Sequence, residues 1–306
     1  MDVSIAALIA ATLAAGTPML LAAIGLLVNE RAGVINLGAE GMMLMSAVLG
    51  FGVALNSGSL WLGLLAGMVA GMGCAAVFAL LAVGLATNQY ATGLALTLFG
   101  SGLSAFVGLG YVGKALPPLS VSGIPGLSQI PFFGEALFRL HPTVYISWLL
   151  VAAVAWALAR TRVGLVIRAV GESGEAAHAL GFPVRSIRAT AVVFGGACCG
   201  LAGAYLSLVH SPLWVEGMVA GRGWIALALT TFATWRPWRV MLGAYLFGSV
   251  TMIQFHMQGQ GVQIASQLLS MLPYLATIVV LVLISRNAGF IRLNMPADLG
   301  RPFKRG

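Results

Sequence analysis

The chain has 306 residues, of which 59% are hydrophobic and only 8% are charged. A soluble domain carries about a quarter charged residues, so this composition excludes a soluble globular protein. The formal net charge of +8 would suit a nucleic-acid partner, but in so apolar a chain basic residues are expected to mark the cytoplasmic loops of a membrane protein.

Apolar stretches follow one another along the whole chain, and runs of about 20 residues are typical of transmembrane helices. They fall near residues 5–28, 35–55, 61–86, 90–112, 143–160, 189–209, 222–235, 239–256 and 267–285. The stretch 222–235 is too short to cross a hydrocarbon core of about 30 Å at about 1.5 Å per residue. We therefore predict an all-α polytopic membrane protein, one domain over 1–306, with about eight full transmembrane helices and one short or broken segment.

Glycines recur at helical spacing in two of these stretches, and they predict close helix packing. Gly63, Gly67 and Gly71 follow one another at every fourth position, as do Gly196 and Gly200. Small residues at this spacing let helices approach closely in lipid, where no hydrophobic force drives helices together.

The distribution of basic residues predicts which loops lie inside. If the charged loop 160–188 is cytoplasmic and the spans alternate, thirteen of the sixteen Lys and Arg residues lie on the cytoplasmic side. This is the distribution that the positive-inside rule describes. It places the N-terminus and the loop 113–142 outside, and the tail 286–306 inside.

The loop 160–188 concentrates charge in a chain that otherwise avoids it. Within it, Ser173 can cap the start of a helix, Glu175 suits the positive end of the helix dipole, and Gly181 suits the stop. These signals predict a helix of about two turns. Such a helix is too short to be stable alone in water, so it needs a partner surface.

The centre of this loop resembles a known motif. Glu175-Ala176-Ala177, followed after three residues by Gly181, resembles the EAA loop of permease subunits in binding-protein-dependent ABC importers, although the Ile-Leu-Pro ending of the general pattern is missing. In that family the loop is a coupling helix that docks in a groove of the ATPase subunit. The resemblance implies that the following residues couple to an ATPase: Glu172, Ser173, Glu175, Ala176, Ala177, His178, Leu180 and Gly181.

Three further blocks resemble the permease branch that serves simple sugars, branched-chain amino acids and nucleosides. They are GTPMLLAAIGLLVNERAGVINLGAEGMMLMSA (16–47), NQYATGLALTLFGSGLSAF (88–106) and GRGWIALALTTFATWRP (221–237). The likeness is greatest to the shorter permease of nucleoside-type (basic membrane protein) systems. It implies import of nucleosides or related purine and pyrimidine compounds across the bacterial cytoplasmic (inner) membrane, with simple sugars or branched-chain amino acids as alternatives.

The same resemblance implies partners. They are an ABC ATPase subunit with tandem nucleotide-binding domains, a second and longer permease paralogue, and an extracytoplasmic solute-binding protein. A homodimer of this chain is the alternative to the paired permeases. The chain has no GxxxxGK[ST] phosphate loop, so we expect no cofactor on it and no enzyme activity, with ATP and Mg on the partner ATPase.

Polar residues inside a membrane are costly and tend to face the interior of the bundle, so they are candidates for a transport path. Asn36 and Glu40 lie at the start of the second span, where Asn36 can cap the helix and Glu40 faces its positive end. The alternative is that Glu40 pairs with Arg31 or with free backbone N–H groups and never contacts substrate.

The fourth span begins with Asn88, Gln89, Thr92 and Phe99. Gln89, Thr92, Leu96 and Phe99 are spaced 3, 4 and 3 residues apart, which predicts one helix face. Hydrogen-bonding groups beside an aromatic plane suit a base or a sugar ring. The alternative is hydrogen bonding between helices.

The short segment carries Trp224 and Thr231 on one predicted face, together with Ala228 and Trp235. Discontinuous helices often mark the path in transporters. Trp235 could instead be an interfacial anchor beside Arg236. A secondary transporter or channel would need an ionisable site within the membrane, and among these residues Glu40 alone qualifies.

Overall fold

The computed structural model describes residues 5–117, 123, 126–259 and 294–303, with isolated residues 268, 271, 272, 275, 278, 279 and 282. Within this part of the chain, seven helices are long and apolar enough to cross a membrane. They are α1 (Ile5–Arg31), α2 (Ala39–Ser57), α3 (Leu60–Ala79, continued by a π-helical turn Leu80–Gly84), α4 (Gln89–Gly108), α6 (Pro142–Arg160), α9 (Val184–Tyr205, continued by a π-helical turn Leu206–His210) and α11 (Pro237–Gly259).

The remaining helices are short. They are α5 (Phe133–Leu137), α7 (Arg162–Glu172), α8 (Gly174–Ala179) and α10 (Arg222–Phe232). At 11 residues α10 cannot span a membrane, which confirms the prediction for the short segment. Seven predicted spans are confirmed. The predicted span 267–285 lies outside the described residues, except for isolated positions. Of the predicted tail 286–306, the described residues are 294–303.

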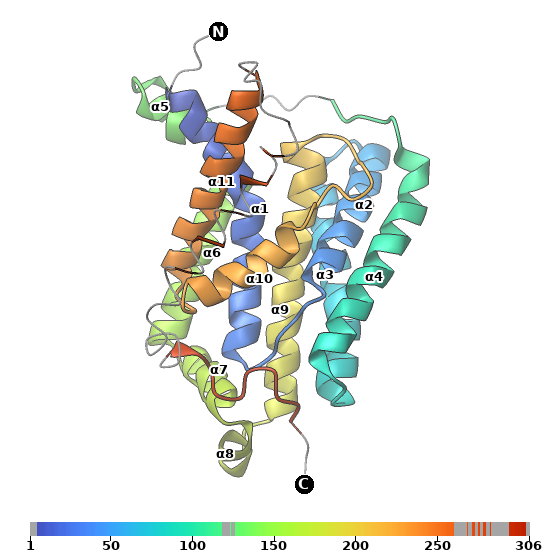
Figure 1. Cartoon of the computed structure of the whole chain (residues 1–306), viewed down its shortest axis with the longest axis vertical. Coiled ribbons are helices and arrows are strands. Elements are labelled where there is room, and N and C mark those ends of the chain that lie inside the picture. Colours follow the sequence, from blue (N-terminus) through green and yellow to red (C-terminus); the bar gives the residue numbers. More distant parts are fainter. Residues whose placement is uncertain are drawn as a thin grey trace.

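The long helices form one bundle around α9 (Figure 1). On one side α9 packs against α1, and on the other against α2 and α3, with α4 lying beyond α2. The helices α6 and α11 pack on the far side of α1. The short helix α10 lies across this arrangement, in contact with α1, α2 and α11.

The two ends of the bundle differ in what they carry (Figure 1). The helices α7 and α8 and the residues 294–303 lie together at one end, whereas α5 and the start of α1 lie at the other. The chain therefore places its charged loop and the described part of its tail at the same end.

Close packing of α3 on α9 follows from the predicted glycine spacing. A Cβ atom on Gly71 would overlap the carbonyl oxygen of Gly196, and one on Gly200 would overlap that of Gly67. Both helices therefore need glycine at the contact, because their backbones touch directly. The outer faces carry large exposed apolar side chains, such as Leu98 and Phe106 of α4, which suit a lipid or protein-covered environment.

Candidate coupling surface and transport path

The predicted coupling helix is present as α8, separated from α7 by Ser173. The hydroxyl of Ser173 accepts a hydrogen bond from the backbone N–H of Ala176 at 3.2 Å, as a helix cap does. Gly181 has φ +87°, in the left-handed region that favours glycine, and it ends the turn after the helix. Both local signals are confirmed, although α8 has only six residues.

Helix α7 is a feature that the sequence reasoning missed. Thr161 caps it by accepting a hydrogen bond from the backbone N–H of Gly164 at 3.1 Å. The signal was available, because apolar residues follow Thr161 at positions 163, 166, 167 and 170, which is helical spacing. The charged loop is thus a pair of helices with a break at Ser173.

The predicted coupling residues differ in their exposure. Ala177 is buried and packs in a small apolar cluster with Val170, Val184 and Phe303. The others, apart from the half-buried Ser173, are exposed: Glu172, Glu175, Ala176, His178, Leu180 and Gly181. Leu180 is 76% exposed at the tip of the loop. Ala177 therefore holds α8 to the rest of the chain, and its neighbours form a surface that a partner can contact.

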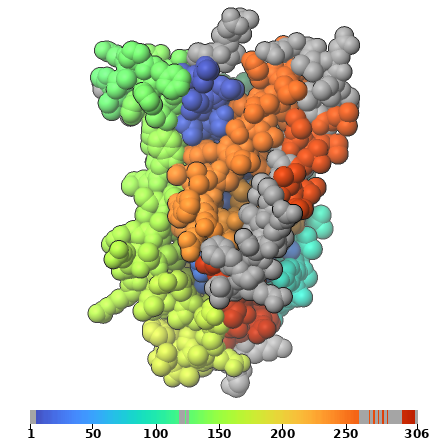
Figure 2. Space-filling model, turned by 60° about the vertical axis from the view of Figure 1, so that its left-hand side comes forward, coloured from blue at the N-terminus to red at the C-terminus, as the bar shows by residue number. Residues whose placement is uncertain are grey.

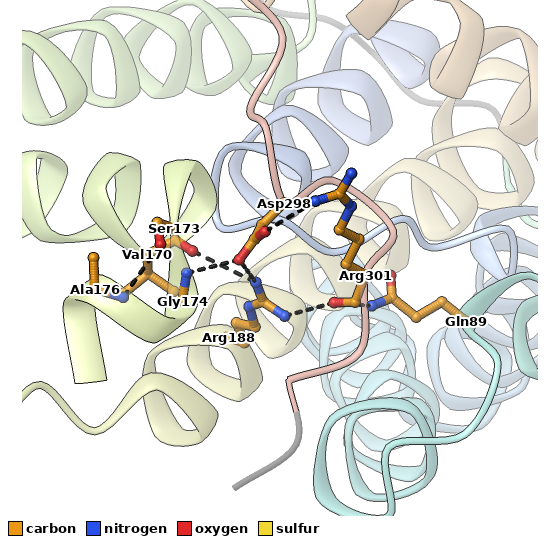
Figure 3. A network of polar contacts seen from close by, with 8 residues as sticks. All are labelled: Gln89, Val170, Ser173, Gly174, Ala176, Arg188, Asp298 and Arg301. Atoms are coloured by element: carbon orange, nitrogen blue, oxygen red, sulfur yellow. Dashed lines mark hydrogen bonds and ion pairs between the residues drawn. The ribbon is translucent and has the colours of Figure 1, made fainter. Parts of the chain in front are cut away.

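Residues 294–303 lie directly beside this surface. In the space-filling view they adjoin α7 and α8 at the end of the molecule (Figure 2). The carboxylate of Asp298 accepts a hydrogen bond at 2.7 Å from the backbone N–H of Gly174, the first residue of α8 (Figure 3). The predicted coupling surface is therefore built from two distant parts of the sequence.

Glu40 binds the start of α10 within the membrane-spanning region. Its two carboxylate oxygens accept hydrogen bonds from the backbone N–H groups of Gly221, at 2.8 Å, and Gly223, at 2.7 Å. A helix N-terminus has free N–H groups and a partial positive charge, so a carboxylate stabilises it. Of the two alternatives for the pairing of Glu40, the structure shows the backbone N–H groups and not Arg31.

Asn36 does not cap α2 as predicted. The cap position is Gly38, and the side-chain oxygen of Asn36 accepts a hydrogen bond from the N–H of Gly38 at 3.0 Å. Asn36 is fully buried and shapes the turn before the helix. The prediction failed because α2 begins later than the apolar run suggests.

A second buried carboxylate, Glu30, was missed by the sequence reasoning. It accepts a hydrogen bond from the indole N–H of Trp235 at 2.5 Å. Trp235 is buried just after the end of α10, so the interpretation of this residue as an interfacial anchor is wrong. The signal was a carboxylate only two residues beyond the first apolar run, 5–28, where the helix still continues. Glu30 and Glu40 thus bind the two ends of the α10 region.

The polar residues at the start of α4 have different roles. Asn88 caps the helix by accepting hydrogen bonds from the N–H groups of Tyr90, at 2.9 Å, and Ala91, at 3.1 Å. Thr92 is half-buried and donates to the carbonyl of Asn88 at 2.8 Å. Gln89 is buried and accepts a hydrogen bond from the N–H of Ile35 at 2.9 Å.

Phe99 lies apart from the buried face of α4. That face packs against α2 through Leu96 and Gly100, and against the turn before α2 through Gly93. The Phe99 side chain is 61% exposed. On α10, Trp224 and Thr231 are partly exposed. The structure thus brings Glu40 together with the start of α10, and leaves Phe99 on an outer face.

Comparison with known proteins agrees with this architecture. A family model described as a branched-chain amino acid transport system permease component matches residues 8–284. A proposed glucose ABC transporter permease of Haloferax volcanii is 42% identical, over 98% of this chain and 98% of its own. A guanosine ABC transporter permease of Bacillus subtilis is 32% identical, over 98% of this chain and 97% of its own.

A further relative bears on partners. A second glucose ABC transporter permease of Haloferax volcanii is 29% identical, over 61% of this chain and 53% of its own. No solved structure matches this chain with significance.

Proposed function

Because this chain belongs to the permease family of branched-chain amino acid transport systems, and so is a multi-pass permease component of an ABC importer, we propose that it imports a sugar-bearing solute with ATP hydrolysed on a separate subunit. The observation that carries the ATP-driven mechanism is α8. It is a short capped helix, with Ala176 and Leu180 exposed at the end of the bundle, where a partner can bind it. Ala177 holds α8 to the rest of this chain, which leaves the exposed side chains of the helix available to a second protein.

Two substrate classes have support from relatives, and both carry a sugar ring. Nucleosides are supported by the relative that transports guanosine, at 32% identity, and glucose by the proposed glucose permease, at 42% identity. Branched-chain amino acids are supported only by the description of the family. We therefore expect the transported solute to be a nucleoside or a hexose, and rank an amino acid after both.

The proposed importer has three partners. They are an ATPase subunit with tandem nucleotide-binding domains, an extracytoplasmic solute-binding protein, and a second, longer permease. The two glucose permeases of Haloferax volcanii support the last. The alignment with the second covers 61% of this chain but 53% of that protein, so that relative is the longer one.

The proposed orientation places α8 in the cytoplasm and the start of α1 outside, in the bacterial cytoplasmic membrane. The excess of Lys and Arg in the loops at the α8 end supports this arrangement. In it, the solute-binding protein docks at the end that carries α5, and the ATPase docks at the end that carries α8.

The decisive experiment is reconstitution of the purified complex in proteoliposomes with its solute-binding protein. Labelled guanosine, glucose and leucine are each offered with and without ATP. ATP-dependent uptake of guanosine or glucose supports the proposal, and uptake of leucine alone would refute the substrate class. Uptake driven by an ion gradient without ATP would favour a secondary transporter. Mass measurement of the complex separates the heterodimer from two identical copies of this chain.

A further inference from the structure

Residues 294–303, which we call the C-terminal strap, connect two separate parts of the bundle by backbone hydrogen bonds. The N–H of Asp298 donates to the carbonyl of Gly171 near the end of α7, at 3.0 Å. Two residues further on, the N–H of Gly300 donates to the carbonyl of Gly33, in the loop between α1 and α2, at 3.1 Å. The strap therefore joins the end of α7 to the loop between the transmembrane helices α1 and α2.

The Asp298 side chain adds two further connections (Figure 3). One carboxylate oxygen accepts the hydrogen bond from Gly174 at 2.7 Å and lies 3.6 Å from the Arg188 guanidinium. Arg188 is buried, with 2% of its side chain exposed, whereas Asp298 is 23% exposed. A buried guanidinium needs a compensating charge, so Asp298 ties α9 to the first residue of α8.

Arg188 also reaches the backbone of the strap. It donates a hydrogen bond to the carbonyl oxygen of Arg301 at 2.8 Å, and Gln89 approaches the same oxygen at 3.5 Å (Figure 3). Gln89 also accepts the N–H of Ile35, in the α1–α2 loop, at 2.9 Å. The strap is thereby connected to the start of α4 and to the turn that precedes α2.

An apolar contact completes the attachment. The ring of Phe303 lies 5.5 Å from that of His178, between ring centroids, and packs in the cluster that contains Ala177. Both ends of α8 are therefore in contact with the strap, Gly174 through a hydrogen bond and His178 through a ring contact. The break at Ser173 separates α8 from α7, so these contacts restrain α8 where the helix pair could bend.

We propose that the C-terminal strap passes displacement of α8 to the α1–α2 loop and to α4, with Asp298 as the positioning residue that holds α8. This inference rests on the proposed function, in which an ATPase binds α8. When the ATPase moves α8, the strap moves with it, and Gly33 and Gln89 receive that displacement. Without the Asp298 contact, α8 can follow the ATPase while the membrane helices stay behind.

The test compares four variants of the reconstituted importer and measures the number of solute molecules imported per ATP hydrolysed. Asp298→Ala removes the acceptor and the charge, whereas Asp298→Asn keeps an oxygen for the N–H of Gly174. Arg301→Ala is the matched control: its contacts with Arg188 and Gln89 are made by the backbone carbonyl, so they remain. Its side chain is 76% exposed and lies 4.0 Å from the Asp298 carboxylate, and an exposed ion pair of this kind contributes little. Glu216→Ala, at an exposed position far from the strap in sequence, controls for the loss of an acidic residue.

We expect Asp298→Ala to lower the ratio about tenfold while hydrolysis continues, as loss of one charge-assisted hydrogen bond can do. Asp298→Asn should fall between Asp298→Ala and wild type, and Arg301→Ala should match wild type. If Asp298→Ala yields no complex, the ratio of solute imported to ATP hydrolysed is measured on Asp298→Asn instead, and that variant tests the proposal. A wild-type ratio in the deciding variant, an equal loss in Arg301→Ala, or a proportional fall in hydrolysis and uptake would overturn the proposal. Failure of the wild-type complex to couple ATP to uptake would instead refute the proposed function.

Discussion

Two short helices, α10 and α8, are held by the same kind of contact in opposite surroundings. The N-terminus of α10 is bound by the Glu40 carboxylate, and that of α8 by the Asp298 carboxylate. Glu40 is 7% exposed within the bundle, whereas Asp298 is 23% exposed at one end. A charge-assisted hydrogen bond is stronger where water is excluded, so we expect the same chemistry to hold α10 more firmly than α8.

The comparison indicates which helix is part of the scaffold and which can move. Helix α10 is also fixed at its other end, where Glu30 accepts the indole N–H of Trp235. Helix α8 presents several exposed side chains, among them Glu175, Ala176 and Leu180. We expect substitutions around α10 to reduce the amount of folded protein, and substitutions on α8 to reduce transport by folded protein.

The largest effect is expected from Glu40→Ala. It leaves the buried N–H group of Gly223 and the part-buried N–H group of Gly221 without the Glu40 acceptor, at about 1–3 kcal/mol for each. A total of several kcal/mol is a large share of the stability of most proteins. We expect little folded protein in detergent extracts, measured by the monodisperse fraction on size-exclusion chromatography.

The control for Glu40→Ala is Glu216→Ala, which removes a carboxylate from an exposed position. It should extract as wild type does. Normal yield and thermal stability of Glu40→Ala would show that α10 is not held by this carboxylate. The proposed difference between a firmly held α10 and a more loosely held α8 would then be wrong.

The next largest effect is on transport alone. Ala176 is exposed on α8, so Ala176→Trp should block docking of the ATPase without disturbing the packing of this chain. Ala177 is buried beneath Phe303, so Ala177→Trp should displace the strap as well. Both variants should insert normally in the membrane and lose uptake.

Two measurements separate these variants. Co-purification of the ATPase should be lost with Ala176→Trp, and thermal stability should fall with Ala177→Trp and not with Ala176→Trp. Wild-type uptake by either variant would contradict the assignment of α8 as the coupling helix.

A moderate effect is expected from Trp235→Phe. The substitution keeps the aromatic ring but removes the indole N–H that Glu30 accepts, so a buried carboxylate loses a donor. We expect a loss of about 1–3 kcal/mol in stability, less than for Glu40→Ala, which frees two donors. Thermal unfolding of the purified protein measures it. Equal losses in the single variants Trp235→Phe and Glu30→Gln and in their double variant would show that the two residues act as one pair.

The sequence predicted the features that depend on local signals. Apolar runs located the described spans, the length of 222–235 predicted a helix too short to cross, and Ser173 and Gly181 predicted the boundaries of α8. Each follows from residues within a few turns of one another, because apolar length, capping and positive φ are properties of a short stretch.

Contacts between distant segments were not predictable from one sequence. Asp298 and Gly174 are separated by 124 positions, and Glu40 and Gly221 by 181. For Glu40 the sequence narrowed the partner to Arg31 or free backbone N–H groups, but only the packing of α10 against α2 decides between them. Trp235 was misjudged for the same reason, since its partner Glu30 lies 205 positions away.

The smallest effect is expected from Phe99→Ala. Comparing its uptake rate with that of Gln89→Ala makes the prediction more specific. Phe99 is exposed on α4, where a transport path shared with a second permease could pass, whereas Gln89 is buried and contacts Ile35 and the strap. A path that releases its solute must bind it weakly, so we expect Phe99→Ala to lower the uptake rate only a few-fold. We expect the solute-binding protein to determine specificity, so the range of solutes should not change.

Gln89→Ala should lower the uptake rate more than Phe99→Ala, because it removes the hydrogen bond to the α1–α2 loop in addition to any contact with solute. Competition uptake with a panel of nucleosides and sugars, at fixed affinity of the solute-binding protein, checks both variants. If either variant admits solutes that wild type excludes, this chain selects its substrate directly. The difference in rate between the two variants then measures how far the path depends on the α8 end of the bundle, because Gln89 hydrogen-bonds to the α1–α2 loop and to the strap.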